Sequence, residues 1–168
     1  MTDRSVIAPR RPTLVVLGEG GHTTEMLALV DGLGPDHDLH YVVIDEDQLS
    51  AERIRRPGRV HRLPRPRAKD AGLLTAVAGT IRAQVQALVL ASQVRPAAIL
   101  TTGPAIGVPV AIAARLLGAE VVFVETISRV TALSGTGRIM RHVADLYVVQ
   151  WRRLATETPG AVYAGRLL

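Results

Sequence analysis

The sequence predicts an α/β fold in which helices cover a doubly wound parallel sheet. Short runs of Val, Leu and Ile alternate with segments of helical character along all 168 residues. Hydrophobic residues make up 48% of the chain and aromatic residues only 3%, so aliphatic side chains must form the core. Strands buried on both faces have this composition, and strand–helix–strand units pair in parallel. We expect one domain over residues 13–168 after a flexible leader over residues 1–12.

Each expected strand is a short apolar run between residues that are typical of turns. Residues 13–17 read TLVVL and lead into a glycine-rich turn, and residues 40–44 read HYVVI and lead into an acidic cluster. Runs of this kind, bounded by Gly, Pro and polar residues, are typical of buried strands. The other strands are expected at residues 60–63, 98–100, 121–124, 146–149 and 161–163.

Helices are expected between these strands, at residues 24–33, 49–55, 72–94, 106–117 and 137–143. Gly34 and Pro35 follow the first helix and Gly118 follows the fourth, as is common at helix C-termini. In residues 72–94 apolar side chains recur with the helical period, which predicts a face packed on the core. Shallow contact of that face with a membrane is the alternative, whereas Arg82 and its neighbouring glutamines disfavour a bilayer span.

The composition excludes several kinds of site. Cysteine is absent, so disulfides, thiolate metal sites and a cysteine nucleophile are excluded. The first twelve residues contain charges and two prolines but no apolar segment, so no signal peptide is expected. The formal net charge is +5, and much of the excess lies in the arginine-rich residues 53–69. This segment is either a solvated loop or a surface for phosphate groups or anionic lipid, and we expect no nucleic-acid partner.

The turn after the first strand carries the clearest functional signal. Residues 18–24 read GEGGHTT, and Gly18, Gly20 and Gly21 would let the backbone turn sharply and approach a ligand. The N–H groups at the start of the following helix would point to the same place, which suits a phosphate or diphosphate. The turn lacks the Lys of a P-loop, and Thr23 stands where a dinucleotide fingerprint has its third glycine. A tight turn without a ligand, and a nicotinamide site using Asp45, remain alternatives.

His22 is the expected proton-transfer group of this turn. A helix N-terminus disfavours the imidazolium, so a neutral ring that accepts a proton is plausible there. The alternative is a histidine that only caps its own helix. We expect Thr23 or Thr24 to be the N-cap and Glu25 to favour the first helical turn by its charge.

Polar residues follow three other strands, and in a parallel sheet they would meet at the same edge. Thr102, Gly103 and Pro104 follow the fourth strand and offer backbone N–H groups and a hydroxyl, or simply a turn. Glu125 follows the fifth strand, where burial would raise its pKa toward that of a general base. A salt bridge to Arg129 or another arginine is an alternative of at least equal weight. Arg129 would suit a phosphate. The single tryptophan, Trp151, follows the sixth strand and would fill the sheet rim or an interface.

Five blocks together resemble one family over residues 14–168. They are GEGGHTTE at 18–25, TGPAIGVP at 102–109, ETISRVTAL at 125–133, ADLYVVQW at 144–151 and VYAGR at 162–166. In this order and spacing the chain resembles the membrane-associated subunit of the split UDP-GlcNAc transferase of lipid-linked oligosaccharide synthesis, asparagine-linked glycosylation protein fourteen. It is also similar to PssD-type exopolysaccharide proteins.

The resemblance implies a Rossmann-like domain equivalent to the N-terminal half of a GT-B glycosyltransferase. A separate partner would bind most of the UDP-sugar, and the pair would transfer GlcNAc or a related sugar, with inversion, to a polyprenyl-diphosphate-linked acceptor. It implies no cofactor, no metal and no Asp-x-Asp motif. Trp151 and the C-terminal Gly165, Arg166, Leu167 and Leu168 would contact the partner. The chain would be inactive, or nearly so, without that partner.

The resemblance also implies a role for each candidate site residue. The acceptor diphosphate and its sugar would lie against Gly18, Gly20, Gly21, Thr23, Thr102, Gly103, Pro104 and Arg129. By analogy with the one-chain transferases of peptidoglycan synthesis, His22 would accept the proton of the attacking hydroxyl, with Glu125 as the less favoured base. A non-catalytic scaffold for the partner, and a nucleotide-dependent oxidoreductase, are the alternative functions.

Two features depart from the family pattern. Eukaryotic members usually begin with a membrane-spanning segment and this sequence does not, so we expect peripheral attachment to the cytoplasmic face of the membrane. The basic residues 53–69, an amphipathic helix, the partner or the acceptor lipid would supply that contact. Glu19 also stands in the loop where a small residue is usual, and its carboxylate would repel a diphosphate by about 1 kcal/mol or more.

Overall fold

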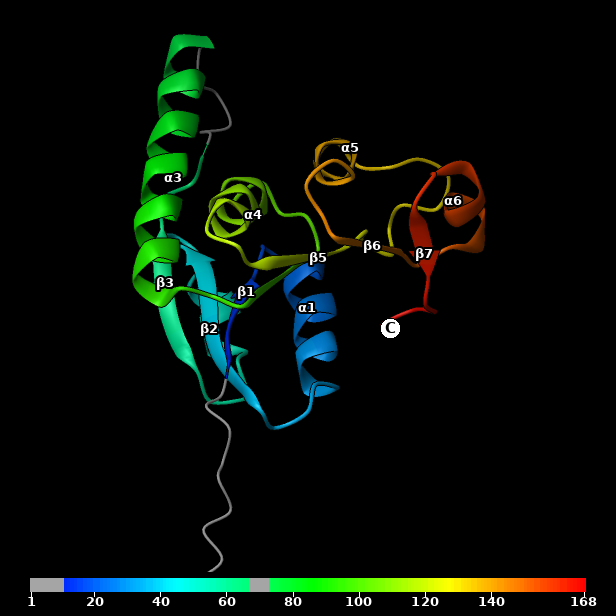
Figure 1. Ribbon diagram of the computed structural model, residues 1–168, viewed down its shortest axis with the longest axis horizontal. Coiled ribbons are helices and arrows are strands. Elements are labelled where there is room, and N and C mark those ends of the chain that lie inside the picture. Colours follow the sequence, from blue (N-terminus) through cyan, green and yellow to red (C-terminus); the bar gives the residue numbers. More distant parts are fainter. Residues whose placement is uncertain (1–10, 67–72) are drawn as a thin grey trace, which may run out of the picture.

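Seven parallel strands form one sheet in the order β3-β2-β1-β4-β5-β6-β7. The computed structural model describes residues 11–66 and 73–168 (Figure 1). The strands are β1 Arg11–Val16, β2 His37–Ile44, β3 Arg59–Leu63, β4 Ala98–Thr101, β5 Glu120–Val124, β6 Leu146–Val149 and β7 Ala161–Tyr163. The predicted α/β class and parallel pairing are therefore confirmed. Residues 1–10 of the expected leader lie outside the described residues, and β1 begins two residues before the predicted strand.

Within the described residues six helices connect these strands, and five of them were predicted. They are α1 Gly21–Asp31, α2 Gln48–Glu52, α3 Leu73–Val94, α4 Gly107–Leu116, α5 Gly135–Met140 and α6 Arg152–Glu157. The short α6 was not predicted, because its six residues carry no periodic apolar pattern. The first helix begins at Gly21 with Gly20 as its N-cap and no capping side chain, so the expected threonine cap is wrong. Glu25 accordingly lies beyond the first turn of α1.

The two faces of the sheet are covered unequally. Alternate residues of β1 point to opposite faces, so Leu14 and Val16 pack with α3, α4 and α5 while Val15 and Leu17 pack with α1. Figure 1 shows the three helices on one side of the sheet and α1 on the other, and the short α2 lies beside α1, since Ser50 of α2 contacts Thr23. On the α1 side, the β4–β6 part of the sheet borders a hollow of about 370 Å³. Its sheet wall is apolar and consists of Leu100, Val122, Val124, Leu146 and Val148.

Helix α3 has two apolar faces. Small residues, Ala83, Ala87 and Ala91, are buried with Leu90 against the sheet and α4. The opposite side carries larger apolar residues at every fourth position, and each is half-exposed or more: Val77, Ile81, Val85 and Val89. The prediction that these larger residues pack on the core is therefore wrong, because alanines allow the helix to approach the core with its other side. No helix within the described ranges has the length and apolar character that crossing a membrane requires.

Arg56 closes the C-terminal end of α1. Its guanidinium donates to the carbonyl oxygens of Val30 at 2.6 Å, Leu33 at 2.8 Å and Gly34 at 3.0 Å. The Val30 carbonyl also accepts from the Leu33 N–H at 3.1 Å, and a cation suits the negative end of the helix dipole. We expect Arg56→Ala to lower the free energy of unfolding by about 1–2 kcal/mol in chemical denaturation. The neighbouring exposed Arg55 is the control, and an equal loss in Arg55→Ala would contradict this assignment.

Candidate functional site

The turn after β1 and the turn after β4 meet at the point where the strand order reverses. Strands β1 and β4 are neighbours although the chain passes through β2 and β3 between them, and such switch points bind ligands in open α/β sheets. A Cβ built on Gly18 would lie 2.5 Å from Cβ of Pro104, so Gly18 is required by contact between the turns. The sequence prediction that these two turns share one edge is confirmed.

The outer side of the glycine turn is open. Gly20 has φ +65°, a conformation that favours glycine, and a Cβ on Gly20 or Gly21 would meet nothing within 4 Å. No side chain caps the N-terminus of α1, so none accepts a hydrogen bond from its leading N–H groups in a cap. The open backbone and the positive end of the helix dipole together suit an anion such as a diphosphate.

His22 is held against the second turn by Thr102. Nδ1 of His22 lies 3.2 Å from the Thr102 hydroxyl, and that hydroxyl donates to the His22 carbonyl oxygen at 3.3 Å. Because the hydroxyl proton is used there, its oxygen accepts from Nδ1–H, and in the neutral ring this arrangement leaves the lone pair on Nε2. Thr102 is fully buried, so its hydroxyl orients His22 and does not contact a ligand.

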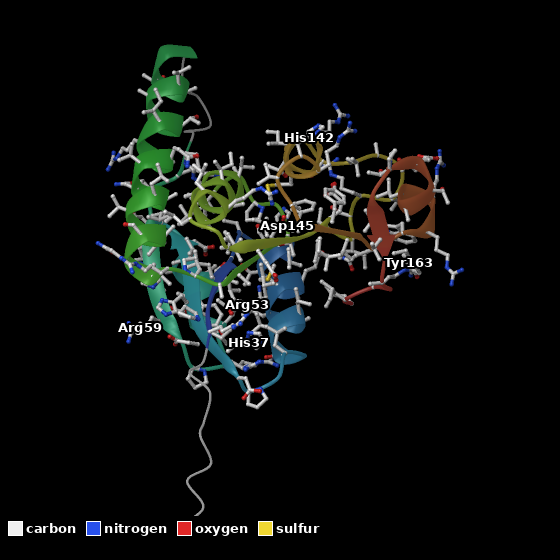
Figure 2. All side chains as sticks on the ribbon, in the orientation of Figure 1. His37, Arg53, Arg59, His142, Asp145 and Tyr163 are labelled. Atoms are coloured by element: carbon white, nitrogen blue, oxygen red, sulfur yellow. The ribbon has the colours of Figure 1, made fainter. Side chains whose placement is uncertain are left out.

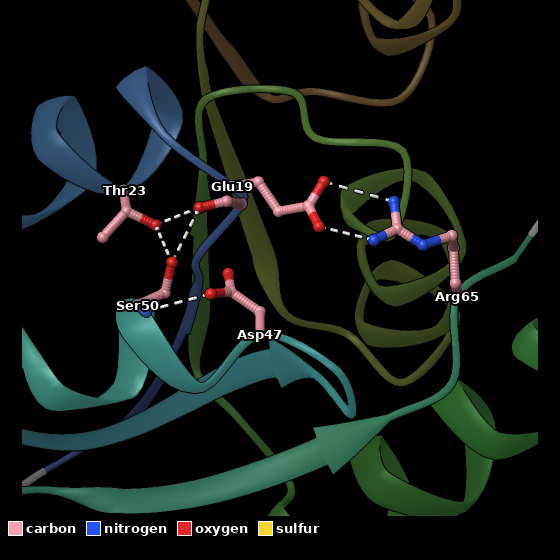
Figure 3. A network of polar contacts seen from close by, with 6 residues as sticks. Glu19, Thr23, Asp47, Ser50 and Arg65 are labelled. Atoms are coloured by element: carbon pink, nitrogen blue, oxygen red, sulfur yellow. Dashed lines mark hydrogen bonds and ion pairs between the residues drawn. The ribbon is translucent and has the colours of Figure 1, made fainter. Parts of the chain in front are cut away.

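Thr23 and Ser50 bind the backbone carbonyl at the start of the glycine turn, as Figure 3 shows. The buried Thr23 hydroxyl donates to the Gly18 carbonyl and lies 2.7 Å from the Ser50 hydroxyl, which also reaches that carbonyl at 3.1 Å. Asp47 caps α2 by accepting from the Ser50 backbone N–H at 2.9 Å. Thr23 was predicted to bind the ligand, but its hydroxyl is committed to the turn itself. Ser50 was missed, although the Asp47-x-x-Ser50 spacing is typical of a helix start.

Glu19 points away from the turn into an ion pair. Both of its carboxylate oxygens accept from Arg65, at 3.2 and 2.5 Å, and Figure 3 shows the two groups facing each other. Arg65 belongs to the predicted basic segment at 53–69, of which residues 67–69 lie outside the described part. The pair neutralises the charge that the sequence placed beside the expected diphosphate.

Glu125 is fully buried at the end of β5 and is satisfied by uncharged donors. Its Oε2 accepts from the Ser134 backbone N–H at 3.0 Å, from the Ser134 hydroxyl at 3.2 Å and from Tyr147 at 3.4 Å. Burial and the nearby Glu125 raise the pKa of Tyr147 far above its ordinary value, so this phenol stays a donor. Within the described ranges Glu125 forms no ion pair, so the alternative of a salt bridge to Arg129 or another arginine is wrong. This geometry favours a structural role for Glu125.

Glu25 forms a second buried carboxylate network that the sequence did not reveal. Its Oε1 accepts from the Thr126 hydroxyl at 2.7 Å, and its Oε2 accepts from the Ile127 N–H at 3.0 Å and from Gln150 at 2.7 Å. The Gln150 amide also donates to the Glu125 carbonyl at 3.1 Å. Glu25 thus ties α1 to the strand ends of β5 and β6.

Comparison with known proteins agrees with this fold and with the five sequence blocks. The family described as "Oligosaccharide biosynthesis protein Alg14 like" matches residues 13–167. The chain belongs to the Alg14 family.

Relatives of this Alg14 family chain carry consistent names. The human "UDP-N-acetylglucosamine transferase subunit ALG14" is 36% identical over 177 residues, covering 92% of this chain and 82% of the human protein. The mouse protein of the same name is 34% identical, with the same two coverages. The resemblance predicted from the sequence is therefore confirmed.

Solved structures place the Alg14 fold among GT-B proteins. MurG of Acinetobacter baumannii superposes with a TM-score of 0.70 at 18% identity over 85% of this chain, and UDP-GlcNAc 2-epimerase of Neisseria meningitidis with 0.68 at 10% over 93%. The chain spans 42% of the first and 47% of the second. Its domain therefore has the Rossmann-like fold that these larger proteins contain.

The predicted interface residues of this Alg14 chain cluster at the C-terminal end of the sheet. Trp151 donates from Nε1 to the Ile127 carbonyl at 2.7 Å, and the Arg166 guanidinium lies 4.1 Å from the centre of its ring. Residues 164–167 line the hollow beside β6, and the Leu167 N–H donates to Gln150 at 2.8 Å. Leu168 is 61% exposed.

Two further sequence predictions concern charged residues in the Alg14 fold. Arg129 is exposed and its side chain makes no ion pair within residues 11–66 and 73–168. Asp45 and Asp47 have Asp-x-Asp spacing, so the expectation that the chain lacks such a motif is wrong. In the described part, no three His, Asp or Glu side chains lie close enough together to hold a metal ion.

Proposed function

We propose that this chain is the acceptor-binding subunit of a two-component inverting glycosyltransferase. The pair transfers GlcNAc, or a related sugar, from a UDP-sugar to a polyprenyl-diphosphate-linked acceptor. The family and the names of its relatives support the transferase role. The observation that carries the acceptor-side role is His22, oriented by Thr102 beside an open glycine turn at the switch point of the sheet.

In this proposal the chain supplies the base and the anion site. The open N–H groups around Gly20 and Gly21 hold the acceptor diphosphate at the positive end of α1. The lone pair on His22 Nε2 accepts the proton of the attacking sugar hydroxyl as its oxygen bonds to the anomeric carbon, and UDP leaves from the opposite side. Thr102 keeps Nδ1 protonated through this step, so that Nε2 is the basic nitrogen.

The donor-binding half comes from a partner subunit in this proposal. GT-B enzymes of one chain are about twice the length matched here, since this chain spans less than half of MurG. The hollow on the α1 side of the sheet leaves Leu146 43% exposed, and residues 164–167 and Trp151 lie around it. An apolar segment of the partner would cover this hollow and recruit the donor site.

Membrane contact is assigned to α3. The row formed by Val77, Ile81, Val85 and Val89 is apolar and faces away from the core. Such a row on a surface helix suits the boundary between headgroups and acyl chains, where the polyprenyl acceptor resides. On this ground we propose peripheral contact with the membrane, and the resemblance to the family supports the cytoplasmic face.

The test is a sugar-transfer assay with UDP-GlcNAc and polyprenyl-diphosphate-GlcNAc. It compares this chain alone, the partner alone, the pair, and the pair carrying His22→Ala. We expect activity only in the pair and a loss in kcat of about a hundredfold in His22→Ala, the contribution of a positioned base. Co-purification checks that the altered chain still binds the partner.

His142→Ala is the matched control, because His142 is exposed on the far side of α5 and away from the glycine turn (Figure 2). It should retain full activity. A His22→Ala pair as fast as wild type, or a fully active partner alone, would reduce this chain to a scaffold. Activity of this chain alone would contradict the two-component proposal.

A further inference from the structure

Arg65 reaches the glycine turn in a geometry that suits phosphate. Its two terminal nitrogens, Nη1 and Nη2, donate to the two carboxylate oxygens of Glu19 at 3.2 and 2.5 Å. This parallel, two-bond pairing of a guanidinium is the arrangement that also binds phosphate oxygens. The described residues contain two other arginine–carboxylate pairs, Arg115 with Asp145 and Arg153 with Glu157. Each of these pairs is joined by a single hydrogen bond and lies away from the turn.

The Glu19–Arg65 pair is weakly held. The Arg65 side chain is 28% exposed and the Glu19 side chain is 54% exposed, so water screens their attraction. Exposed pairs of this kind stabilise a protein by about 0–1 kcal/mol. A diphosphate carries more charge than a carboxylate and can make the same two bonds, so it can replace Glu19 at little cost to the fold.

The pair lies between groups of both charges, and the helix start and Arg53 are the ones that attract an anion. Glu19 lies between Gly18 and Gly20, next to the uncapped start of α1. A cavity of about 660 Å³ lies beside the turn, and its lining includes Glu19, Gly20 and Arg53 together with the carboxylates of Glu46, Asp47 and Glu52. The Arg53 guanidinium donates to the Thr24 hydroxyl at 2.8 Å and forms no ion pair with a carboxylate of the described residues. A second cation thus flanks the turn.

We propose that Arg65 binds the diphosphate of the acceptor, and that Glu19 occupies Arg65 in the free chain until the diphosphate displaces it. This inference rests on the proposed function, since it names a further ligand of the same acceptor. Glu19 is then a competitor of the substrate, and its carboxylate turns to solvent when the acceptor binds. The unusual carboxylate in the loop is therefore a regulator of affinity for the acceptor.

The test measures binding of inorganic pyrophosphate and of a short-chain polyprenyl-diphosphate-GlcNAc to the full chain by titration calorimetry. Arg65→Ala should weaken both affinities about tenfold or more, because it removes a two-bond cation. Glu19→Gln should strengthen both affinities several-fold, because the competing carboxylate is gone. In the Arg65→Ala background the effect of Glu19→Gln should become much smaller, whereas simple repulsion by Glu19 would leave it unchanged.

Arg59→Ala is the matched control, because Arg59 (labelled in Figure 2) begins β3, whereas Arg65 follows the other end of that strand. It removes the same charge and should change both affinities less than twofold. Equal affinities of Arg65→Ala and Arg59→Ala would overturn this inference while leaving the acceptor site in place. A wild-type chain that binds neither probe would overturn both the inference and the acceptor-binding role.

Discussion

Glu25→Ala is expected to lower the free energy of unfolding by about 3 kcal/mol or more. The substitution leaves the Thr126 hydroxyl, the Ile127 N–H and the Gln150 amide without their buried acceptor. Each such orphaned donor costs about 1–3 kcal/mol. For a domain of this size, 1 kcal/mol shifts Tm by about 2–4 °C, so we expect a fall of roughly 6–12 °C in thermal unfolding.

Two variants separate this network from a general effect of lost charge. Glu25→Gln keeps the side-chain volume and one acceptor oxygen, so its loss should be smaller, about 1–2 kcal/mol. Glu120→Ala removes an exposed carboxylate at the start of β5 and should change stability by less than about 0.5 kcal/mol. A Tm of Glu25→Ala within about 2 °C of the wild-type Tm would correspond to a loss of about 1 kcal/mol or less. That result would contradict the stabilising role of the network.

Gly137→Ala is expected to be the second strongly destabilising change. A Cβ at Gly137 would overlap Oε2 of Glu125 and would lie 2.9 Å from both the Ser134 and Tyr147 hydroxyl oxygens. Glu125 is fully buried and held by these same groups, so it has no space into which to move. Overpacking of this kind costs about 1–3 kcal/mol, and breaking the carboxylate's bonds adds to it. Urea denaturation would measure the loss.

Gly135→Ala is the matched control in the same helix. A Cβ there meets nothing within 4 Å, and alanine favours the helix over glycine by up to about 1 kcal/mol. Gly135→Ala should therefore be neutral or slightly stabilising. If both variants lost the same stability, the cause would be the α5 backbone and not the space around Glu125.

The sheet was predictable because each strand stands out locally as an apolar run. Residues such as Val15 and Val42 are buried on both faces of the sheet, and their composition alone indicates this. The meeting of Gly18 with Pro104 followed from parallel pairing, since strand ends then share an edge. His22 was likewise found from its place in the turn, before its contact with Thr102 was known.

The polar networks were not predictable, because they join residues far apart in the chain. Glu25 and Gln150 are 125 positions apart, and no local pattern marks either residue as the partner of the other. A glutamate near a helix start is usually read as a favourable charge, so Glu25 was placed wrongly. Ile81 was predicted to face the core for a related reason. Helix α3 has apolar residues on two sides, and the helical period does not show which side packs on the sheet.

Helix α3 packs on the core with its alanine side and presents its larger apolar residues on the opposite, outer side. Because Ala83, Ala87 and Ala91 are fully buried or nearly so and set how closely the helix packs, the larger residues on the opposite side, half-exposed or more, contribute less to the packing of the core. Replacing Ile81 or Val85 by another apolar residue leaves the core unchanged and alters only the outer surface. If α3 contacts the membrane as proposed, natural selection can adjust the strength of that contact, residue by residue, with little change in the folding stability of the domain.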